Sequence, residues 1–594
     1  MTELDPLTCP HGARCGGCAF LGVPYAEQLA LKQASIERVF AHYREAPALP
    51  IARVAGAQPT HGYRTRAKLV FGAAGELGLF ERDSHAVVDI PECRVLGPEL
   101  LRVAAAARHV VGSSRTRLDG LDLRVVDDGV LVTLIAAQGT PRSDLEQLSQ
   151  ALCAASPEVR SVAASFREPG AATVLGTGHV LLHGAEALRH HLLAARPYHL
   201  AAHGAFTQAH PGQANAAHDA IERALTELGA KRVLELYAGS GALSLRLSES
   251  GFRMTAVEAF APALAHAEQA AREQRLVLCT RSGSAERVLR ELSAEHAEFD
   301  AILVNPPRRG LSVEVRLACA ALNPRAILYM SCEPKTLARD LSQLKGLGYA
   351  AQGLWPFDMI PHSAAVESLV VLRQSSPPLP EVLFEDARCL AVLKSGYEPV
   401  TQGAGGGGSL LERVRRLPGA SAATPLSAQR LDSDSSGVCW FARDPSYAAE
   451  LGQAFYDGTQ SFVGLVRGVS HKRGRIRRPV REQRRVISAS TRYLREAVSS
   501  GHSRLTIWPE RSTPLQIRQL LVGVGHPLLG DTQFGDPGSN TFFEHRHGLD
   551  RTFLHCSAVT LSFASGPITV EAPLPGELLT VLASLAEQAA PKGE

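Results

Sequence analysis

The sequence predicts a multidomain α/β protein with an N-terminal α+β module, a central parallel, doubly wound sheet and a mixed β-rich C-terminal domain. The central sheet is predicted because strand patterns alternate with amphipathic, helix-length segments from about residue 205. The strand patterns are RVLELY, FRMTAVE, FDAILVN and AILYMS. The third domain is predicted because this alternation stops after the Pro/Ser-rich segment QSSPPLP at 374–380.

The domains are expected in the following order along the 594 residues. The first module covers 1–200, the sheet domain 201–373, a linker 374–380 and the last domain 381–594. Within the first module, a helical pattern begins at Tyr25 and is followed by the strand patterns YRTRAKLVF and VLVTLIA. The segment GAGGGGS at 403–409 is expected to be a loop inside the last domain, since strand patterns lie on both sides of it.

The composition is that of an ordinary globular protein. Apolar residues make up 45% and charged residues 20%, and the net charge of +3 does not by itself indicate a polyanionic partner. No stretch is apolar enough to span a bilayer, and the first residues lack the pattern of a signal peptide. We therefore expect a cytoplasmic protein without a membrane partner and without an obligate protein partner.

Four of the 11 cysteines form a cluster in the sequence. Cys9, Cys15 and Cys18 lie within ten residues of one another among several glycines, and 74 residues separate Cys18 from Cys93. In a reducing compartment such a set is more typical of metal ligation than of disulfides. Four thiolates suit either a 4Fe–4S cluster or a tetrahedral zinc ion, so the type of ligand leaves both open.

The segment RVLELYAGSGALSL at 232–245 is typical of a strand, a Gly-containing turn and a helix. Gly239 and Gly241 let a ligand approach the backbone closely, and Glu258 at the end of the next strand can hold two ribose hydroxyls. A dinucleotide site would need glycine at Ser244, and a phosphate loop would need a Gly-Lys-Ser/Thr sequence. S-adenosylmethionine remains as the candidate ligand; a tight turn without any ligand is the alternative.

Two polar loops are expected at the carboxyl ends of parallel strands, where such sheets bind ligands: NPPRRG at 305–310 and SCEPKTLARDL at 331–341. This places Cys332 as a nucleophile beside a methyl donor. Uracil C5 is a weak nucleophile, but addition of a thiolate at C6 turns C5 into an enolate carbon that can attack a sulfonium methyl group. A base must then remove the C5 proton, and Glu367 is the candidate. For Cys332 alone, a buried and unreactive thiol is the alternative.

Over about residues 9–373 these segments together resemble the TrmA-like RNA 5-methyluridine methyltransferases. The shared pattern comprises the cysteine cluster, an F-x-Q segment, the LYAGSG turn, a (D/N)PPR motif, an SCxPxTLARDL loop and a final glutamate. The resemblance implies a Rossmann-like methyltransferase domain, S-adenosylmethionine, a 4Fe–4S cluster rather than zinc, and a uridine in structured RNA. It also implies that Arg308 holds RNA or the loop, and that four residues contact the cofactor: Gln208, Tyr237, Glu258 and Asn305.

The sequence departs from this family in three ways. It has no counterpart of the RNA-binding barrel that some relatives carry at the N-terminus, Asn305 replaces the commoner aspartate, and Ala365 stands where histidine is usual. We expect the two substitutions to affect the rate more than the reaction. The nearest competing chemistry is an NPPY-type amino-methyltransferase, which would need an aromatic residue at Arg308 and has no use for Cys332.

From about 381 to 573 the sequence resembles the RluA-like pseudouridine synthases. The segments that carry the resemblance are VLFEDARCLAVLKSGYEPV, QRLDSDSSGVCWFAR, SFVGLVRG and PLQIRQLLVGVGHPLLGDTQFGD. The resemblance implies that Asp432 is the catalytic aspartate of a uridine-to-pseudouridine isomerisation, in which a carboxylate assists cleavage of the N-glycosidic bond. Gln429, Phe462 and Thr513 replace the family's histidine, tyrosine and arginine. A methyltransferase whose decayed synthase domain serves as an RNA-binding arm is therefore the alternative.

A basic run, HKRGRIRRPVREQRR at 471–485, contains eight Lys and Arg and one Glu between Lys472 and Arg485. Such a run suits a phosphate backbone, although charge runs are also found in solvated loops. Taken together, the sequence predicts a bifunctional RNA-modifying enzyme, with ribosomal RNA as the expected substrate. Both reactions need the target uridine flipped out of its stack, which costs least in loops and bulges.

Overall fold

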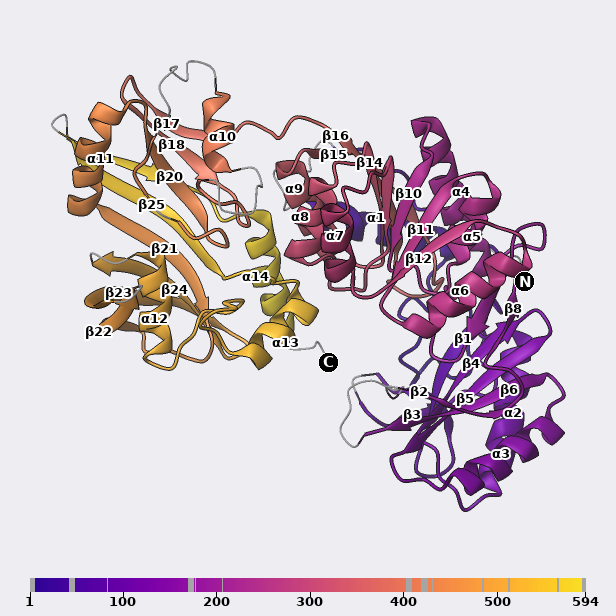
Figure 1. Cartoon of the computed structure of the whole chain (residues 1–594). Coiled ribbons are helices and arrows are strands. Elements are labelled where there is room, and N and C mark those ends of the chain that lie inside the picture. Colours follow the sequence, from indigo (N-terminus) through magenta and orange to yellow (C-terminus); the bar gives the residue numbers. More distant parts are fainter. Residues whose placement is uncertain are drawn as a thin grey trace.

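The structure is a computed structural model, and Figure 1 shows it as three parts joined in sequence order. An N-terminal sheet lies at one end, a second sheet lies in the middle, and the C-terminal half lies at the other end. The residues described are 6–41, 49–82, 84–168, 176, 178–205, 207–401, 409–417, 426–429, 431–482, 485–510, 513–563 and 566–589. The expected glycine-rich loop therefore lies, apart from its last residue, outside the described residues.

The N-terminal part is built on a seven-stranded sheet in the order β3-β2-β1-β4-β5-β6-β7. Its strands are β1 (Arg66–Phe71), β2 (Leu77–Phe80), β3 (Val87–Asp89), β4 (Gly120–Val126), β5 (Gly129–Ala137), β6 (Val159–Arg167) and β7 (Val180–His183). Helices α2 (Pro98–Gly112) and α3 (Arg142–Ala155) bury their apolar residues in one core with these strands. Two short strands, β8 (Ala187–His190) and β9 (His199–Ala202), pair separately and lead to the next part.

The middle part is a seven-stranded sheet in the order β12-β11-β10-β13-β14-β16-β15. Five strands are parallel: β10 (Arg232–Leu236), β11 (Arg253–Glu258), β12 (Leu278–Ser282), β13 (Ala301–Val304) and β14 (Ala326–Ser331). The four expected strand patterns fall in this parallel set, so the doubly wound sheet is confirmed. Two antiparallel strands complete the sheet: β15 (Tyr349–Phe357) and β16 (Glu367–Gln374).

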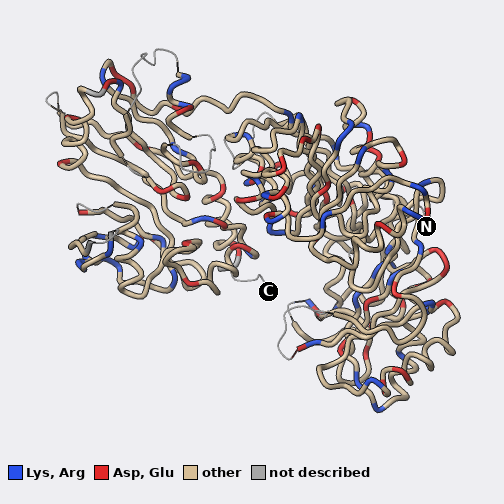
Figure 2. Tube along the Cα trace, viewed as in Figure 1, with Lys and Arg blue, Asp and Glu red and all other residues tan. Residues whose placement is uncertain are grey.

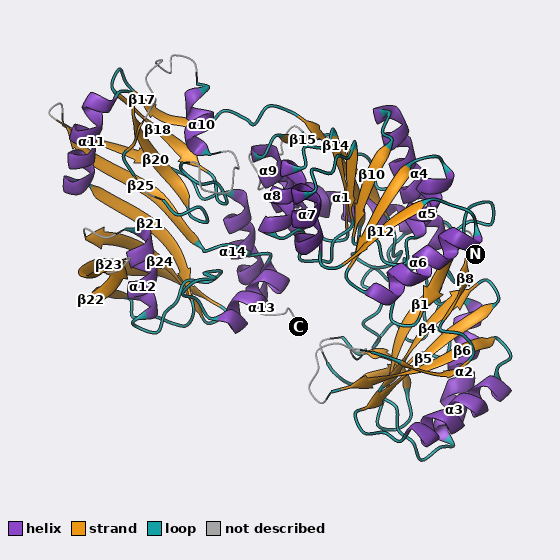
Figure 3. Ribbon diagram, viewed as in Figure 1, coloured by secondary structure: helices purple, strands orange, loops and turns teal. Residues whose placement is uncertain are grey.

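Helices cover both faces of this middle sheet, and each face has its own apolar core. Figure 3 shows helices on both sides. One side carries α4 (Pro211–Leu228), α5 (Ala242–Glu249) and α6 (Ala261–Glu273); the other carries α7 (Ala285–Ala294), α8 (Val313–Ala321) and α9 (Pro334–Gly346). Apolar residues buried on both faces explain why the parallel strands read as continuous apolar runs in the sequence.

The first helix, α1 (Tyr25–Ala41), does not follow the expected division at residue 200. Its Ile36 and Phe40 are buried in the core of the middle sheet, not in the core of the N-terminal sheet. Lys32 of the same helix forms a fully buried ion pair with Asp358, with 2.5 Å between Nζ and Oδ1. The amphipathic pattern predicted the helix, but it could not show which sheet the apolar face would cover.

The C-terminal half contains a ten-stranded sheet whose main path is β17-β18-β20-β25-β21-β24-β23-β22. Its strands are β17 (Val382–Glu385), β18 (Cys389–Lys394), β19 (Leu426–Ser427), β20 (Ser436–Ala442), β21 (Thr459–Val466), β22 (Arg473–Glu482), β23 (Arg485–Ser499), β24 (His502–Glu510), β25 (Leu554–Phe563) and β26 (Gly566–Glu571). Its helices are α10 (Leu410–Arg415), α11 (Pro445–Asp457), α12 (Pro514–Val522), α13 (Pro537–His547) and α14 (Gly576–Ala589). The mixed, β-rich character that the sequence predicts is confirmed. Among the described residues, no helix has the length and apolar character needed to cross a bilayer.

Candidate functional site

The glycine turn after β10 has the strained backbone that its sequence indicates. Tyr237, Gly239 and Gly241 all have positive φ angles, of 62°, 57° and 72°. Glu258, at the end of the neighbouring strand β11, faces this turn: Gly239 N donates to Oε2 at 3.0 Å and Phe260 N donates to Oε1 at 2.9 Å. The acid that the sequence singles out therefore lies at the turn.

The turn lies where the order of strands reverses in the sheet. Strand β10 has β11 on one side and β13 on the other, so the loops that follow these strands diverge. Asn305 directly follows β13 and is exposed at this same edge. Open parallel sheets bind ligands in this position. Gln208 is half-buried in the segment before α4, and its contact with a cofactor stays a prediction.

The sequence interpretation missed one carboxyl group below the turn. Glu235 is buried within β10 and accepts a hydrogen bond from the Ser244 hydroxyl. Burial raises the pKa of Glu235 to about 7, although the bond from Ser244 acts in the other direction. This pairing explains why serine stands where a dinucleotide site would have glycine. An acid in the middle of the apolar run RVLELY was the signal that could have revealed it.

Cys332 and Glu367 lie at the same end of two paired strands. Strands β14 and β16 are antiparallel, and Ser331 is the partner of Ser368 at the end of the ladder. Cys332 directly follows Ser331, and Glu367 directly precedes Ser368. The predicted nucleophile and the predicted base, although far apart in the sequence, therefore lie at the same end of the sheet.

The charges around this pair give the two groups distinct properties. Burial is the main factor that raises the pKa of the Cys332 thiol, and the charge of Glu367 adds to it. Burial also raises the pKa of Glu367 to about 7. Arg308 opposes both shifts, since its cationic side chain lowers the pKa of the thiol and of the carboxyl group. Near neutral pH, Glu367 can thus take up or release a proton.

The four clustered cysteines line a single, mainly apolar cavity of about 40 Å³. Burial raises the pKa of Cys18 to about 11, and the neighbouring cysteines, Cys93 first, add to this shift. Within the described part of the chain, no group of three or more His, Cys, Asp or Glu side chains lies in an arrangement that could hold a metal ion. The thiols are the right donors for an iron–sulfur cluster and share one cavity, but they do not form a closed ligand set.

The cysteine loop contacts the segment that leads to Glu367. Phe20 N donates to the carbonyl oxygen of His362 at 2.9 Å, and the Tyr63 hydroxyl donates to that of Pro361 at 3.1 Å. The His362 ring also lies 2.9 Å from the Thr60 carbonyl oxygen. The N-terminal module thus supports the loop that precedes the predicted base.

In the C-terminal half, Asp432 lies in a turn before β20 and forms an ion pair with Arg518 of α12. The Asp432 Oδ2 atom is 3.0 Å from Arg518 Nη1. The other edge of Arg518 binds the buried Asp531 at 2.8 and 2.7 Å, which fixes the guanidinium. Lys394 Nζ donates to the carbonyl oxygens of Ser433 and Ser435 at 3.2 and 2.5 Å. The side chain of Asp432 stays 31% exposed, so the carboxylate is both oriented and accessible.

Burial raises the pKa of Asp432, while Arg518 acts to lower it. The residues that replace the family's histidine, tyrosine and arginine make other contacts in this structure. Gln429 is buried and donates to Gln460 Oε1 at 3.2 Å, and Thr513 N donates to Gln516 Oε1 at 3.1 Å at the start of α12. Phe462 is fully buried in the core. A phenyl ring at this position could in principle stack on a base, but in this structure the ring is packed in the core and is not available for stacking.

Most of the basic run forms β22, which pairs with β23 in a hairpin. Arg473, Arg475, Arg477 and Arg481 alternate with buried Ile476 and Val480, so the arginines lie exposed on one face. Figure 2 shows the concentration of Lys and Arg in this region. Arg475 stands opposite Arg492, and Glu510 pairs with both, at 2.7 and 3.0 Å. The expected basic segment is thus an ordered surface of a sheet.

Comparison with known proteins agrees with the geometry of the middle sheet. Residues 193–375 match the family model described as tRNA (uracil-5-)-methyltransferase. This match covers the middle sheet and its helices. An uncharacterized RNA methyltransferase of Geobacter sulfurreducens is 28% identical over 390 residues, which cover 63% of this chain and 78% of the relative. One of Caldanaerobacter subterraneus is 27% identical over 393 residues, covering 63% and 85%.

Two solved structures resemble parts of this chain. The tRNA (uracil-54, C5)-methyltransferase of Pyrococcus abyssi, in complex with S-adenosyl-L-homocysteine, has a TM-score of 0.48 and 21% identity; the match covers 62% of this chain and 87% of that one. The human RNA pseudouridylate synthase domain containing 4 has a TM-score of 0.30 and 18% identity, with coverage of 35% and 93%.

Proposed function

We propose that this protein methylates C5 of a uridine in structured RNA with S-adenosylmethionine, using Cys332 as nucleophile and Glu367 as base. The observation that carries the proposal is that these two residues lie next to the last pair of β14 and β16, at the same end of both strands, where the charge of Glu367 acts on the Cys332 thiol. The glycine turn and Glu258 lie at the switch point of the same sheet. Related proteins named RNA methyltransferases support the choice of RNA as substrate.

The residues divide the proton and electron movements between them. The thiolate form of Cys332 adds through its sulfur to C6 of uracil, and the electron pair of the C5–C6 double bond moves to place negative charge on C5 and on the C4 carbonyl oxygen. The cofactor supplies an electrophilic methyl group, which C5 then receives. Glu367 removes the proton from C5, the electron pair restores the C5–C6 double bond, and the C6–sulfur bond breaks to return the thiolate. Arg308 stabilises the anionic forms of both residues.

The turn at 237–241 and Glu258 would hold S-adenosylmethionine. Each carboxylate oxygen of Glu258 already accepts one backbone hydrogen bond, and each retains an acceptor position for a ribose hydroxyl. Gly239 and Gly241 provide close approach to the backbone, and we assign Gln208, Tyr237 and Asn305 to the same ligand. The shared cavity of Cys9, Cys15, Cys18 and Cys93 supports a role for these thiols in holding a 4Fe–4S cluster.

Replacement of the nucleophile tests the methylation directly. Cys332→Ala should abolish 5-methyluridine formation on bulk ribosomal RNA, and it should also abolish the covalent adduct that wild-type protein forms with RNA containing 5-fluorouridine. In that RNA the carbon–fluorine bond cannot be broken by a base, so the enzyme stays attached. Cys279→Ala removes an exposed thiol of β12 and should change neither result. Methylation by the Cys332 variant would refute the assigned role.

We infer that the C-terminal half isomerises uridine to pseudouridine through Asp432. An exposed carboxylate held by a fixed arginine supports this second activity. The replacement of the family tyrosine by the buried Phe462 favours the alternative, in which this half only binds RNA. A pseudouridine count on RNA treated with wild-type protein and with Asp432→Asn distinguishes the two. Loss of pseudouridine with unchanged 5-methyluridine supports a second enzyme, and absence of pseudouridine from both supports a binding arm.

The exposed arginines of the β22–β23 hairpin support an RNA phosphate backbone as the partner of the C-terminal half. We propose ribosomal RNA as the substrate. Mass mapping of ribosomal RNA from cells with and without this protein would identify the modified uridines. If the modified uridines of ribosomal RNA are the same in cells that lack the protein, transfer RNA would be the next substrate to test.

A further inference from the structure

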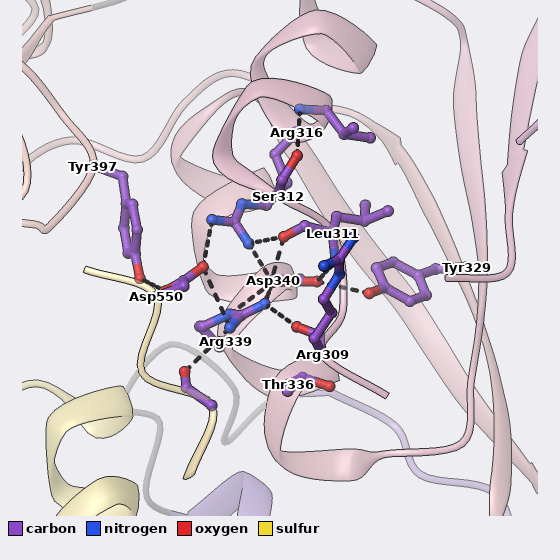
Figure 4. A network of polar contacts seen from close by, with 12 residues as sticks. Arg309, Leu311, Ser312, Arg316, Tyr329, Thr336, Arg339, Asp340, Tyr397 and Asp550 are labelled. Atoms are coloured by element: carbon purple, nitrogen blue, oxygen red, sulfur yellow. Dashed lines mark hydrogen bonds and ion pairs between the residues drawn. The ribbon is translucent and has the colours of Figure 1, made fainter. Parts of the chain in front are cut away.

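The C-terminal half contacts the methyltransferase part through a buried polar network, which Figure 4 shows from close by. Its central residue is Asp550, in the loop between α13 and β25. Asp550 Oδ2 lies 3.0 Å from Arg316 Nη2 of α8 and 3.3 Å from Arg339 Nη1 of α9. The hydroxyl of Tyr397 donates to its other carboxylate oxygen. Arg339 Nη1 also donates to the carbonyl oxygen of Gly548 at 3.1 Å.

The charges at this junction balance only when both halves contribute. The side chains of Arg316 and Arg339 are 1% and 2% exposed, so two guanidinium groups are buried together. Within the methyltransferase part both pair with one carboxylate, Asp340, at 2.5 and 2.7 Å. Asp550 supplies the second negative charge. Breaking a buried pair by removing one partner is costly because the remaining charge is left uncompensated.

Asp550 carries its charge in this setting. Burial acts to raise the pKa of Asp550, but Arg339 and Arg316 outweigh burial and keep that pKa below its ordinary value. The carboxylate is therefore ionised throughout the neutral range, and its replacement by an amide removes a full charge.

The same arginines hold the loop that carries Arg308. Arg339 Nη2 donates to the carbonyl oxygen of Arg309 at 2.9 Å, and Arg316 Nη1 donates to that of Leu311 at 2.6 Å. Asp340 Oδ2 accepts a hydrogen bond from Leu311 N at 2.8 Å. Gly310, at φ 78°, packs so closely that a Cβ there would lie 2.6 Å from Asp340 Oδ2. The loop thus rests directly on the charged network.

The network also reaches the nucleophile through α9. This helix begins at Pro334, two residues after Cys332, and Arg339 and Asp340 belong to it. Thr336 of the same helix donates to the carbonyl oxygen of Arg308 at 2.9 Å. A shift of α9 relative to the 305–311 loop would therefore change the position of Cys332 relative to Arg308.

We propose that Asp550 is a positioning residue for methyl transfer, so that the C-terminal half completes the methyltransferase site across the domain junction. It acts through Arg316 and Arg339, which lock α9 against the 305–311 loop and so fix Cys332 beside Arg308. The proposal rests on the methyl transfer proposed above. It gives the fusion of the two halves a function that is independent of any pseudouridine synthesis.

Asp550→Asn in the full chain tests the proposal. The amide keeps the shape of the side chain and removes its charge. We expect kcat for RNA methylation to fall about 10- to 100-fold, because small displacements of reacting groups have effects of this size. KM for S-adenosylmethionine should change less than kcat, because the glycine turn and Glu258 lie outside the network and only Asn305 of the assigned cofactor residues belongs to the loosened loop. Amide hydrogen exchange of residues 305–311 should become faster, while exchange in β20 of the C-terminal half should not. Asp550→Glu should recover part of kcat.

Glu398→Gln is the matched control, because it removes an ion pair that lies within the C-terminal half. Glu398 pairs with Arg413 at 2.8 Å, and the two side chains are 14% and 11% exposed. The control should leave kcat unchanged. An unchanged kcat in Asp550→Asn, or an equal loss in Glu398→Gln, would overturn the proposal. If wild-type protein does not methylate RNA, the proposed function fails. In that case, an unchanged rate of amide hydrogen exchange at residues 305–311 in Asp550→Asn would separately refute the proposal that Asp550 holds this loop.

Discussion

At the scale of single residues, the pKa values of the predicted nucleophile and the predicted base depend on one cationic side chain, that of Arg308. Arg308 is the group that lowers the pKa of both Cys332 and Glu367, whereas burial raises both. The thiol must be ionised to add to uracil, and the carboxyl group must be ionised to accept the C5 proton. Activity should therefore rise with pH through about 7, the value to which burial raises the pKa of Glu367.

Replacement of this cation should move the pH profile. In Arg308→Gln both pKa values should rise, because the charge that lowers them is gone. The rising limb of kcat/KM against pH should shift to higher pH by about one unit. The rate of adduct formation with RNA containing 5-fluorouridine, measured across the same pH range, reports the thiol step alone and should shift in the same direction.

Arg309→Gln is the control for this experiment. Arg309 is also exposed, but it contributes to the network through its carbonyl oxygen, which the substitution retains. Its profile should keep the wild-type midpoint. A shift to lower pH in Arg308→Gln would show that this arginine does not act on the two groups electrostatically.

The sequence singled out candidate residues of this site but not their neighbours. Cys332, Glu367 and Glu258 could be singled out because of their chemistry and their positions at the ends of predicted strands, and their roles stay predictions. Asp550 could not, since its partner Arg316 is 234 residues away along the chain and no local pattern joins them. Phe462 could be recognised as a substitution, but only the packed core shows that its ring is buried.

At the scale of secondary structure, the alternation of strands and helices predicted four of the five parallel strands, but neither β12 nor the antiparallel pair that closes the sheet. Each of β10, β11, β13 and β14 reads as an apolar run before a helical segment, so local sequence is sufficient to indicate it. The antiparallel strands β15 and β16 follow no such repeat. The register of β16 against β14 arises from long-range pairing, and this register places the predicted nucleophile and the predicted base at the same end of the sheet.

The β22–β23 hairpin should act as an element in RNA binding. Joint replacement of Arg473, Arg477 and Arg481 by glutamine should weaken affinity for RNA at low salt. It should also make the slope of log K against log salt shallower by about 2 to 3, since each lost phosphate contact removes about 0.7 to 0.9. Fluorescence anisotropy with a labelled RNA over a series of salt concentrations measures both quantities.

Arg478→Gln is the matched control on the same strand. The Arg478 guanidinium donates to the carbonyl oxygen of Gly523 at the end of α12, so it is directed toward the protein. This variant should keep the wild-type slope. An unchanged slope in the triple variant would place the RNA on another surface.

At the scale of the whole molecule, two buried ionic contacts join parts that the sequence presents as separate. Asp550 joins the C-terminal half to the middle sheet, and Lys32 joins the first helix to the same sheet. Asp358 also accepts a hydrogen bond from the Tyr25 hydroxyl at 2.8 Å. Both contacts are buried, so the free energy of unfolding depends on these ion pairs between the C-terminal half, the first helix and the middle sheet.

Lys32→Met should destabilise the protein strongly. The substitution retains the apolar stem but leaves the carboxylate of Asp358 buried without its cation, which costs about 3–5 kcal/mol in such pairs. Urea denaturation followed by circular dichroism measures the change in the free energy of unfolding. The double variant Lys32→Met/Asp358→Leu should recover most of the loss. A single variant that unfolds at the wild-type urea concentration would contradict this account.

The arrangement of Cys332 and Glu367 at the ends of β14 and β16 determines which insertions and register shifts the protein can tolerate. The two groups meet because β14 and β16 run side by side, so the length of polypeptide between them is not what aligns them. Residues added at the turn by Gly348, between α9 and β15, would leave the chemistry in place. A slip of one residue between β14 and β16 would instead send one of the two side chains to the opposite face, and the reaction would stop with every residue still present.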